Sequence, residues 1–354
     1  MLLSVIRQRR CRGGIYLYLI SLEINPALLI AIVAAVVLLL VAGVVLLLYK
    51  VTVTGIVDKV YKRPRPMPQV DRSPKQIERE TVIGRGRNWF YANRMQFLNV
   101  GVTSFDGTHL AGYYRPSAER GCRNAVILIP GYDEHPSKMA AYARLIMKQM
   151  QCSILIIHPR AHLMSEGDIF TYGLMESVDL DAWFDFLKKR VGSNCNIYLM
   201  GRSVGALTVL LAAQQEGFSE NVAGIIVDSP GETLTELICS WTMAKKKRNV
   251  QRYMPGVRRL TEKRYGFDME RCDCSVHAGR IKVPVLIFQG GSDEITKPVK
   301  TRHIFDNLRC EKRMVVVDDA GHNECYDKAP SLYEKEIRKF IETCMVRLVK
   351  IGRL

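Results

Sequence analysis

Several classes of protein are excluded by what the sequence contains little of. It has 26 Gly and 14 Pro in 354 residues, far fewer than a collagen-like or other Gly/Pro-rich fibre would require. With 48% hydrophobic residues the chain is too apolar to be disordered throughout, and 10 Cys are too few for a disulfide-stapled miniprotein. These cysteines are scattered and fit free core thiols as well as disulfides. The length fits one large globular domain or two ordinary ones.

Acidic residues are also scarce, and the resulting positive charge is local. The chain has 51 Lys and Arg against 35 Asp and Glu, a formal net charge of +16. Residues 1–66 contribute +7 and residues 241–264 contribute +8, which leaves +1 for all other residues. The run Lys245–Arg248 resembles a nucleic-acid-binding patch, but no nucleic-acid-binding fold signature accompanies it, and we expect no nucleic acid partner. The charge at residues 241–264 predicts contact with anionic lipid, steering of an anionic substrate, or a solvated surface.

A long apolar run lies near the start of the chain. Ala27 to Tyr49 contains 23 residues without a charge, and as a helix it would be about 35 Å long. A globular helix is rarely apolar on all sides over such a length, and a signal peptide has a shorter apolar region with a small-residue cleavage site. We therefore predict one uncleaved transmembrane helix, with Tyr49 and Lys50 at the membrane interface. Basic residues flank both ends, so the positive-inside rule does not select the side on which the rest of the chain lies.

Two segments flank the predicted span. Residues 1–26 carry no useful hydrophobic pattern, and we hypothesise that translation starts near Leu22. Residues 50–95 include a basic, Pro-rich stretch at 59–69, which we expect to be an extended tether that lies near lipid head groups or in solvent. A helix is expected over residues 73–94, because a Ser-Pro pair opens it, and Ser is favoured at the N-cap and Pro at the first helical position.

From about residue 96 to residue 354, short apolar runs alternate with helical patterns. In Leu174 to Lys189, for example, apolar residues recur on one helical face. An Asp-Gly pair at residues 106–107 separates two strand patterns and predicts an antiparallel hairpin. The alternation predicts an α/β domain with a mostly parallel, doubly wound sheet preceded by this hairpin. Residues 232–280 break the alternation, and we interpret them as a helical, basic cap insertion. The predicted strands are 97–105, 109–114, 125–129, 153–157, 196–200, 224–227, 283–288 and 313–317.

Residues 201–205, Gly-Arg-Ser-Val-Gly, match the pattern G-x-S-x-G. The pattern alone is weak, but here a strand-like run precedes it and a helix-like run follows it. A serine on a sharp strand-to-helix turn presents its hydroxyl at the carboxyl edge of the sheet, where the helix N-terminus favours developing negative charge. Gly201 and Gly205 are needed because strand and helix approach too closely there for side chains. Ser203 is therefore the candidate nucleophile.

A serine nucleophile needs a base, and the base needs a carboxylate that holds its tautomer. After a turn of this kind the partners follow in the order serine, acid, histidine. Asp293 lies in a Gly-rich turn after one predicted strand, and His322 lies in the loop after the next. Both therefore lie at the edge of the sheet that carries Ser203. We prefer Asp293 as the acid because it follows its strand directly in a Gly-x-x-Asp turn; the rival acids are Glu294, Asp318 and Asp319.

An acyl-transfer reaction also needs donors for an oxyanion. Two backbone N–H groups would serve, one from the residue after the nucleophile, Val204, and one from the loop after the third strand, residues 129–133. In this loop Gly131 permits a tight turn, and we expect the N–H of Tyr132 to be the donor.

Together these residues resemble the α/β-hydrolase superfamily, and more closely the membrane-anchored bacterial serine hydrolases of the prolyl-oligopeptidase-like and esterase group. The similarity extends from about Phe97 to the C-terminus. It rests on the G-x-S-x-G turn, on residues 290–293, on residues 321–322, and on residues 158–167, which are similar to the family's Arg-Gly-His-Gly-x-Ser-x-Gly turn. Two features depart from the family: Pro130 replaces the usual His before Gly131, and Ala161 and Leu163 stand where that turn has glycines.

The resemblance implies an α/β-hydrolase fold and an acyl-enzyme mechanism. Ser203 would attack the substrate, His322 would take its proton and later activate water, and Asp293 would orient His322. We expect a single-pass membrane serine hydrolase that cleaves a carboxylic ester or related, lipid-like acyl substrate and contacts a bilayer with anionic head groups. The alternatives are a serine peptidase or acyltransferase on the same scaffold, and a non-catalytic membrane scaffold that binds through its cap.

We expect no metal and no organic cofactor. His158 and His162 stand four residues apart and Cys272 and Cys274 two apart, a pattern that could indicate zinc. The two histidines fall within the turn that the resemblance explains without metal, however, and no second Cys pair has ligand spacing.

Overall fold

The computed structural model describes residues 3–10, 16–23, 25–62 and 80–353, and it forms two compact units that divide after Gly55. In the first unit, β1 (Leu3–Arg10) and β2 (Tyr16–Glu23) form an antiparallel pair. The hydrophobic pattern of residues 1–26 does not predict this pair. The helix α1 (Pro26–Tyr61) follows, and its last residues belong to the second unit.

The helix α1 is longer than the predicted span. It begins after Asn25, whose side-chain carbonyl accepts a hydrogen bond from the second helical residue at 2.9 Å. Its 36 residues make a helix about 54 Å long, and it is long and apolar enough to cross a membrane. The extended tether is predicted for residues 59–69, but residues 59–61 belong to α1 instead. No proline interrupts residues 50–61, and the first one, Pro64, lies beyond the last helical turn.

The second unit is built on an eight-stranded sheet with the order β10-β9-β8-β7-β5-β6-β4-β3. The strands from β5 to β10 are parallel to their neighbours, whereas β4 is antiparallel to β6 and β3 is antiparallel to β4. Each predicted strand overlaps one of these eight, which confirms the mostly parallel sheet with an N-terminal antiparallel hairpin. The strands are β3 (Leu98–Thr103), β4 (His109–Arg115), β5 (Asn124–Ile129), β6 (Ser153–Ile157), β7 (Asn196–Arg202), β8 (Val222–Asp228), β9 (Val285–Gly290) and β10 (Lys312–Val317).

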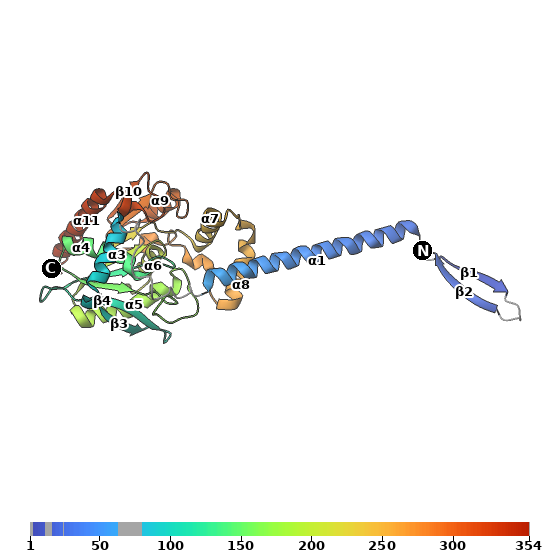
Figure 1. Ribbon diagram of the computed structural model, residues 1–354, viewed down its shortest axis with the longest axis horizontal. Coiled ribbons are helices and arrows are strands. Elements are labelled where there is room, and N and C mark those ends of the chain that lie inside the picture. Colours follow the sequence, from blue (N-terminus) through green and yellow to red (C-terminus); the bar gives the residue numbers. More distant parts are fainter. Residues whose placement is uncertain (1–2, 11–15, 24, 63–79, 354) are drawn as a thin grey trace. The chain divides into compact units, whose positions relative to one another are not determined.

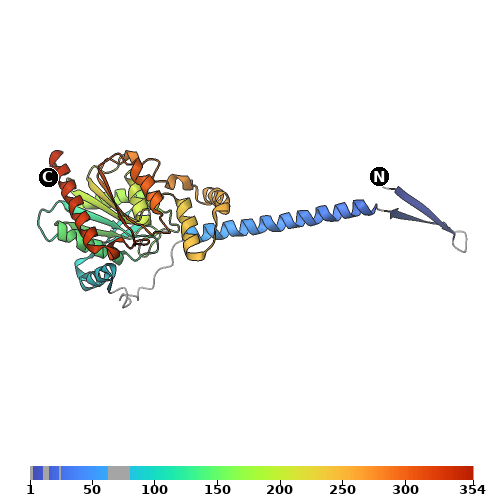
Figure 2. The same ribbon diagram turned by 90° about the horizontal axis from the view of Figure 1, so that it is seen from above.

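Helices cover both faces of this sheet (Figures 1 and 2). Successive residues of β5 point to opposite faces, as the geometry of a strand requires. Ile127 packs in the core beneath α5 and α6, whereas Leu128 packs in the core beneath α4 and α11. The helices other than α1 and those of the cap are α3 (Val82–Ala92), α4 (Ala140–Gln149), α5 (Leu174–Val191), α6 (Val204–Ala212), α9 (Pro298–Asn307), α10 (Cys325–Lys328) and α11 (Pro330–Lys350).

The helix α3 lies within the range predicted to be helical, residues 73–94. It starts at Val82, and the hydroxyl of Thr81 caps it by accepting a hydrogen bond from the N–H of Gly84 at 2.9 Å. The predicted capping pair, Ser73 and Pro74, lies outside the described residues, as does the tether from residue 63 to residue 69.

The predicted cap contains two helices, α7 (Leu234–Lys246) and α8 (Met254–Tyr265), between β8 and β9. The last turn of α1 packs against the end of α8. Tyr61 is fully buried, and its ring lies 5.2 Å from the ring of Tyr265 and 5.4 Å from that of Phe267. Asp58 forms an ion pair with Arg264. Through these aromatic and ionic contacts, residues 56–61 of α1 pack against the cap and belong to the second unit.

Candidate active site

The turn between β7 and α6 consists of Ser203 alone. Its φ of +54° lies in the left-handed region, which is rare for a residue with a side chain and is found preferentially at functional sites. A Cβ on Gly201 would lie 2.2 Å from the carbonyl oxygen of Gly205, and a Cβ on Gly205 would lie 2.3 Å from that of Ile129. Strand, turn and helix therefore approach too closely for a side chain at either glycine.

The structure brings together the three residues of the predicted triad. Ser203 Oγ lies 2.8 Å from His322 Nε2, and His322 Nδ1 lies 2.8 Å from Asp293 Oδ2. The three residues follow β7, β10 and β9 respectively, so they meet at the carboxyl edge of the parallel strands. When Nδ1 donates its proton to Asp293, Nε2 is left to accept the hydroxyl proton of Ser203.

Asp293 is held rigidly in the loop after β9. Its Oδ1 accepts the backbone N–H groups of Ile295 and Thr296, both at 2.8 Å, and its Oδ2 accepts the hydroxyl of Thr296 at 2.7 Å. Burial alone would raise the pKa of Asp293, but hydrogen bonds from His322 and Thr296 outweigh burial and hold that pKa below its ordinary value. Asp293 is therefore an ionised, buried carboxylate beside the histidine.

The rival acids lie elsewhere. Glu294, Asp318 and Asp319 are exposed, whereas the side chain of Asp293 is completely buried. Among the described residues, the hydrogen-bond partners of His322 Nδ1 are Asp293 and the hydroxyl of Thr296, the latter at 3.2 Å. The sequence prediction does not include Thr296. The available signal is Asp293 itself, because an aspartate in a loop often forms an Asx turn, in which its side chain accepts the backbone N–H groups two and three residues further along.

The loop after β5 lies directly against the serine. A Cβ on Gly131 would lie 3.3 Å from Ser203 Cβ, so the loop passes close to the serine at Gly131. No described residue accepts a hydrogen bond from the backbone N–H of Tyr132 or of Val204. An oxyanion-hole donor must be free of such a partner, and the assignment of these two amides stays a prediction.

An aromatic chain connects this loop to the end of α1. The ring of Tyr132 stacks on that of Tyr172, with 5.3 Å between centroids. Tyr172 in turn donates its hydroxyl to the carbonyl of Val60 at 2.9 Å and contacts the ring of Tyr61 at 6.4 Å. The expected oxyanion loop and the last turn of α1 thus share one packed cluster.

Two charged residues at the site are absent from the sequence prediction. Arg202 Nη1 donates to Glu134 Oε1 at 2.7 Å, and Glu134 Oε2 accepts the N–H of Gly131 at 3.1 Å. Arg202 Nη2 donates to the carbonyl of Asn323, the neighbour of His322, at 2.8 Å. The side chains of Arg202 and Glu134 are only 8% and 12% exposed, so this ion pair is shielded from water.

Both histidines of the turn at residues 158–167 are buried. His162 Nε2 accepts the N–H of Asp133 at 3.0 Å, and burial lowers the pKa of His158 to about 3. Ala161 and Leu163 have φ of +57° and +44°, a conformation that glycine adopts without strain. Across the described part of the chain, no three His, Cys, Asp or Glu side chains gather as a metal site would require.

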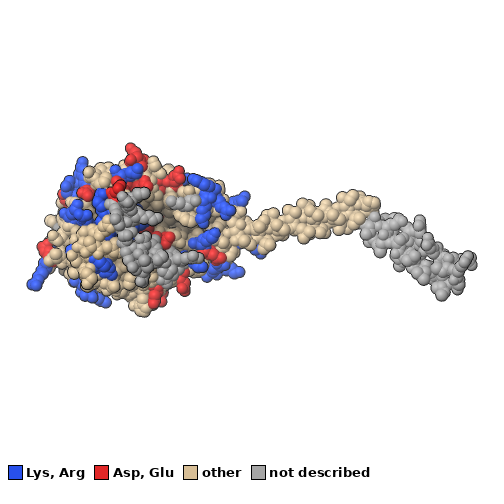
Figure 3. Space-filling model, viewed as in Figure 1, with Lys and Arg blue, Asp and Glu red and all other residues tan. Residues whose placement is uncertain are grey.

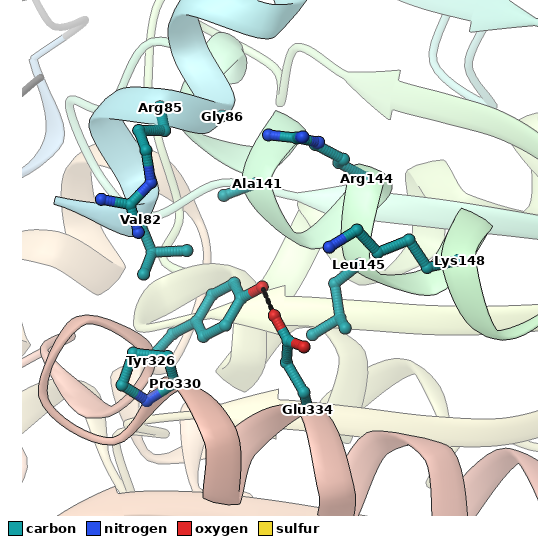
Figure 4. A pocket seen from close by; sticks show the side chains of 10 residues that line it. All are labelled: Val82, Arg85, Gly86, Ala141, Arg144, Leu145, Lys148, Tyr326, Pro330 and Glu334. Carbon is teal, nitrogen blue, oxygen red and sulfur yellow. Dashed lines mark hydrogen bonds between the residues drawn. The ribbon is translucent and has the colours of Figure 1, made fainter. Parts of the chain in front are cut away.

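Two cavities lie away from the serine. One, of about 280 Å³, lies between α3, α4 and α11, with Arg85, Arg144 and Lys148 on its wall and Tyr326 donating its hydroxyl to Glu334 at 3.2 Å (Figure 4). The other, of about 760 Å³, lies between α5, α6 and the cap. Neither is lined by a triad residue, so neither forms part of the candidate active site.

Comparisons with other sequences find distant relatives. No protein-family model matches the chain. The uncharacterized protein YfhR of Salmonella typhimurium is 24% identical over 252 residues, which are 70% of this chain and 82% of YfhR. The uncharacterized protein YqkD of Bacillus subtilis is 23% identical over 267 residues, which are 75% of this chain and 86% of YqkD.

Comparisons with solved structures identify the architecture. The esterase Pf2001 of Pyrococcus furiosus has a TM-score of 0.59 and 19% identity, covering 72% of this chain and 95% of its own. The alpha/beta hydrolase GrgF from Penicillium sp. sh18 has a TM-score of 0.54 and 16% identity, covering 71% and 99%. An acylaminoacyl peptidase of Pyrococcus horikoshii has a TM-score of 0.52 and 16% identity, covering 70% and 41%. At these identities the likeness establishes a shared fold.

Proposed function

The chain has the α/β-hydrolase fold, and on this basis we propose that it is a membrane-anchored serine hydrolase that cleaves a carboxylic ester or related acyl substrate. The observation that carries the proposal is the relay from Ser203 Oγ through His322 to Asp293, with 2.8 Å at each step and a buried carboxylate at its end. A surface histidine near a serine would not need an ionised, fully hydrogen-bonded aspartate behind it.

The first half of the reaction forms an acyl-enzyme. His322 Nε2 takes the hydroxyl proton while Ser203 Oγ bonds to the acyl carbon, and the carbonyl electrons move to the oxygen. The N–H groups of Tyr132 and Val204 stabilise that oxyanion, and Asp293 stabilises the imidazolium. Collapse of the intermediate breaks the bond to the leaving group, which receives the proton from His322.

The second half releases the acyl group. His322 Nε2 takes a proton from water, the hydroxide oxygen bonds to the acyl carbon, and the same two amides stabilise the second oxyanion. The bond to Ser203 Oγ then breaks, the serine regains the proton from His322, and the carboxylic acid leaves. This cycle uses the side chains of the chain itself and water.

Membrane anchoring is the second part of the proposal. It is supported by the length and apolarity of α1 and by the exposure of its apolar residues, for example Ile30, Leu39 and Leu46 at 69%, 72% and 61%. A buried globular helix would cover most of these side chains. We infer one span over residues 27–49, with the second unit attached to its C-terminal end.

The test uses a fluorophosphonate, which reacts covalently with an activated serine. Wild-type protein should be labelled, Ser203→Ala should not, and Ser193→Ala, which removes an exposed hydroxyl before the opposite end of β7 from the turn, should be labelled like wild type. Labelling of Ser203→Ala would contradict the assignment. Wild-type protein that is folded but never labelled would favour a non-catalytic scaffold instead.

An amide-cleaving enzyme is the second candidate, because the acylaminoacyl peptidase noted above shares this fold. The triad serves both reactions, so the distinction lies in the substrate. A panel of acyl esters beside acyl-amino-acid and dipeptide amides separates the two. We expect kcat/KM for the best ester to exceed that for every amide; the reverse order would make the protein a peptidase.

A further inference from the structure

The helix α7 has an apolar stripe whose last member is exposed. Leu234, Leu237 and Ile238 are buried, but Trp241, one turn further along the same side, is 43% exposed. The nearby Met243 is 44% exposed. A tryptophan in this position extends the stripe beyond the body of the protein, and tryptophan beside basic residues is typical of surfaces that lie at a membrane interface.

The segment after this tryptophan is strongly basic. We call residues 246–264 the basic cap segment; it contains eight Lys and Arg residues and one Glu. The ammonium group of Lys246 lies over the ring of Trp241, 5.0 Å from its centroid. Arg258 and Arg264 have acidic partners. The basic residues of the segment without an acidic partner among the described residues are Lys246, Lys247, Arg248, Arg252, Arg259 and Lys263, and all six are exposed.

The basic cap segment is attached next to the candidate span. Its Arg264 pairs with Asp58, and Tyr265, directly after it, packs on Tyr61. Asp58 is eight residues after Lys50, a distance of about 12 Å along a helix. The contacts of Arg264 and Tyr265 thus attach the segment to residues that follow the candidate span closely in the sequence. Figure 3 shows Lys and Arg side chains around the end of the second unit at which α1 joins it.

We propose that the basic cap segment and Trp241 bind the anionic lipid head groups of the membrane that α1 spans. Unpaired cations near a surface of anionic lipid are attracted to it, whereas a zwitterionic surface offers them no net charge. The attraction falls off over about one Debye length, roughly 8–10 Å, so docking requires the exposed Lys and Arg side chains to reach closer to the surface than Asp58, which lies about 12 Å along the helix from Lys50. The inference rests on the proposed membrane anchor but not on the proposed hydrolysis.

The test measures contact between Trp241 and lipid in the full chain. The protein is reconstituted into phosphatidylcholine vesicles with or without phosphatidylglycerol, and each set contains lipid brominated near the head group, which quenches nearby tryptophan. Trp241→Phe gives the signal of Trp89 and Trp183, the other two tryptophans of the chain, for subtraction. We expect Trp241 to be quenched more in phosphatidylglycerol than in phosphatidylcholine, and the difference to disappear at high salt.

A charge variant and a matched control test whether the basic cap segment causes the difference in quenching between the two lipids. The cap variant combines Lys246→Gln, Lys247→Asn and Arg248→Gln; Asn is chosen because Lys247 has a φ of +52°. The control removes three charges from the last turn of α5, at Lys188, Lys189 and Arg190. Since each cation near an anionic surface strengthens binding about fivefold, the cap variant should weaken docking by on the order of a hundredfold, and the control should leave it unchanged.

The outcomes separate docking from anchoring. Flotation with phosphatidylcholine vesicles reports the anchor alone, and its failure would contradict the anchor proposal. With flotation intact, equal quenching in the two lipids would overturn the docking proposal, as would an equal loss in the α5 control. An altered KM for an anionic substrate in the cap variant, with quenching unchanged, would assign the charge to substrate steering instead and would also overturn it.

Discussion

Arg202 and Glu134 form a shielded ion pair that connects the nucleophile turn to the loop after β5. Arg202 directly precedes the nucleophile, and Glu134 binds the N–H of Gly131 in the loop that carries the expected oxyanion donor. The same guanidinium holds the carbonyl of Asn323, beside the histidine. One pair of side chains thus sets the relative positions of the three segments on which the proposed reaction depends.

Removing the charge of Glu134 should slow the chemical step. Glu134→Gln retains an acceptor for the N–H of Gly131 but weakens the hold of Arg202 on the loop. We expect kcat to fall by roughly tenfold to a hundredfold with little change in KM, because the oxyanion donors act mainly in the transition state. Steady-state kinetics on an ester measures both constants. Glu342→Gln, at an exposed position of α11, is the control; a change in KM alone would contradict the positioning role.

Glu134 also predicts a response to acid. Burial alone would raise its pKa, but the charges of Arg202 and Lys138 outweigh burial and hold that pKa below its ordinary value. Such a carboxylate contributes stability above its unfolded pKa of about 4.3, and the contribution is lost as the pH falls through the lower folded pKa. The free energy of unfolding of the wild type should exceed that of Glu134→Gln by about 3 kcal/mol at neutral pH. This difference should shrink below about pH 4. Denaturant unfolding in detergent at several pH values measures it; a difference that grows in acid would refute the prediction.

Asp293 and its neighbours differ in environment, and their variants should differ in activity. Asp293→Asn removes the charge that orients His322 and stabilises its imidazolium, so kcat should fall by on the order of a thousandfold or more. Asp319→Asn and Glu294→Gln change exposed carboxylates and should retain activity within about twofold of wild type. Initial rates with one ester substrate compare all four proteins. A large loss in Asp319→Asn would reassign the acid.

The close approach at the nucleophile turn predicts a loss of stability. A Cβ at residue 205 would lie 2.3 Å from the carbonyl oxygen of Ile129, so Gly205→Ala requires β5 or α6 to shift. We expect it to cost about 3 kcal/mol or more, or to prevent folding. Gly55→Ala is the matched control, because a Cβ at Gly55 meets nothing within 4 Å. Thermal unfolding in detergent should separate the two; equal melting temperatures would show that the turn can relax.

The fold and the proximity of the triad follow from signals within the sequence. The strands are short apolar runs, and a parallel sheet places all of their carboxyl ends at one edge, so residues in the turns and loops that follow the strands are brought together by topology. Ser203, Asp293 and His322 each have this position. The two glycines of the turn follow from the same geometry, because the steric limit is set by the backbone.

Other features depend on side-chain contacts that carry no local pattern. Glu134 and Arg202 are 68 residues apart, and neither position belongs to a spacing that chemistry requires. The sequence prediction misses the extension of α1 to Tyr61 for a similar reason. Lys50, Asp58 and Lys59 resemble a solvated linker, and the packing of Tyr61 against the cap is a tertiary contact that no local pattern indicates. The sequence therefore indicates where the reacting groups lie better than what holds them.

The packing of the last turn of α1 against the cap determines where a shortened protein that lacks the proposed span should begin. A version beginning after residue 62 would lack Val57 and Tyr61, both completely buried, and would leave a hole beside Tyr172. Tyr132 stacks on that tyrosine, so the damage would extend to the loop next to the serine. A version beginning at Ile56 would keep both of these side chains and remove the proposed span. If the version that begins after residue 62 has low activity and the version that begins at Ile56 does not, the loss comes from the missing residues 56–61. It is then not evidence that the reaction needs a bilayer.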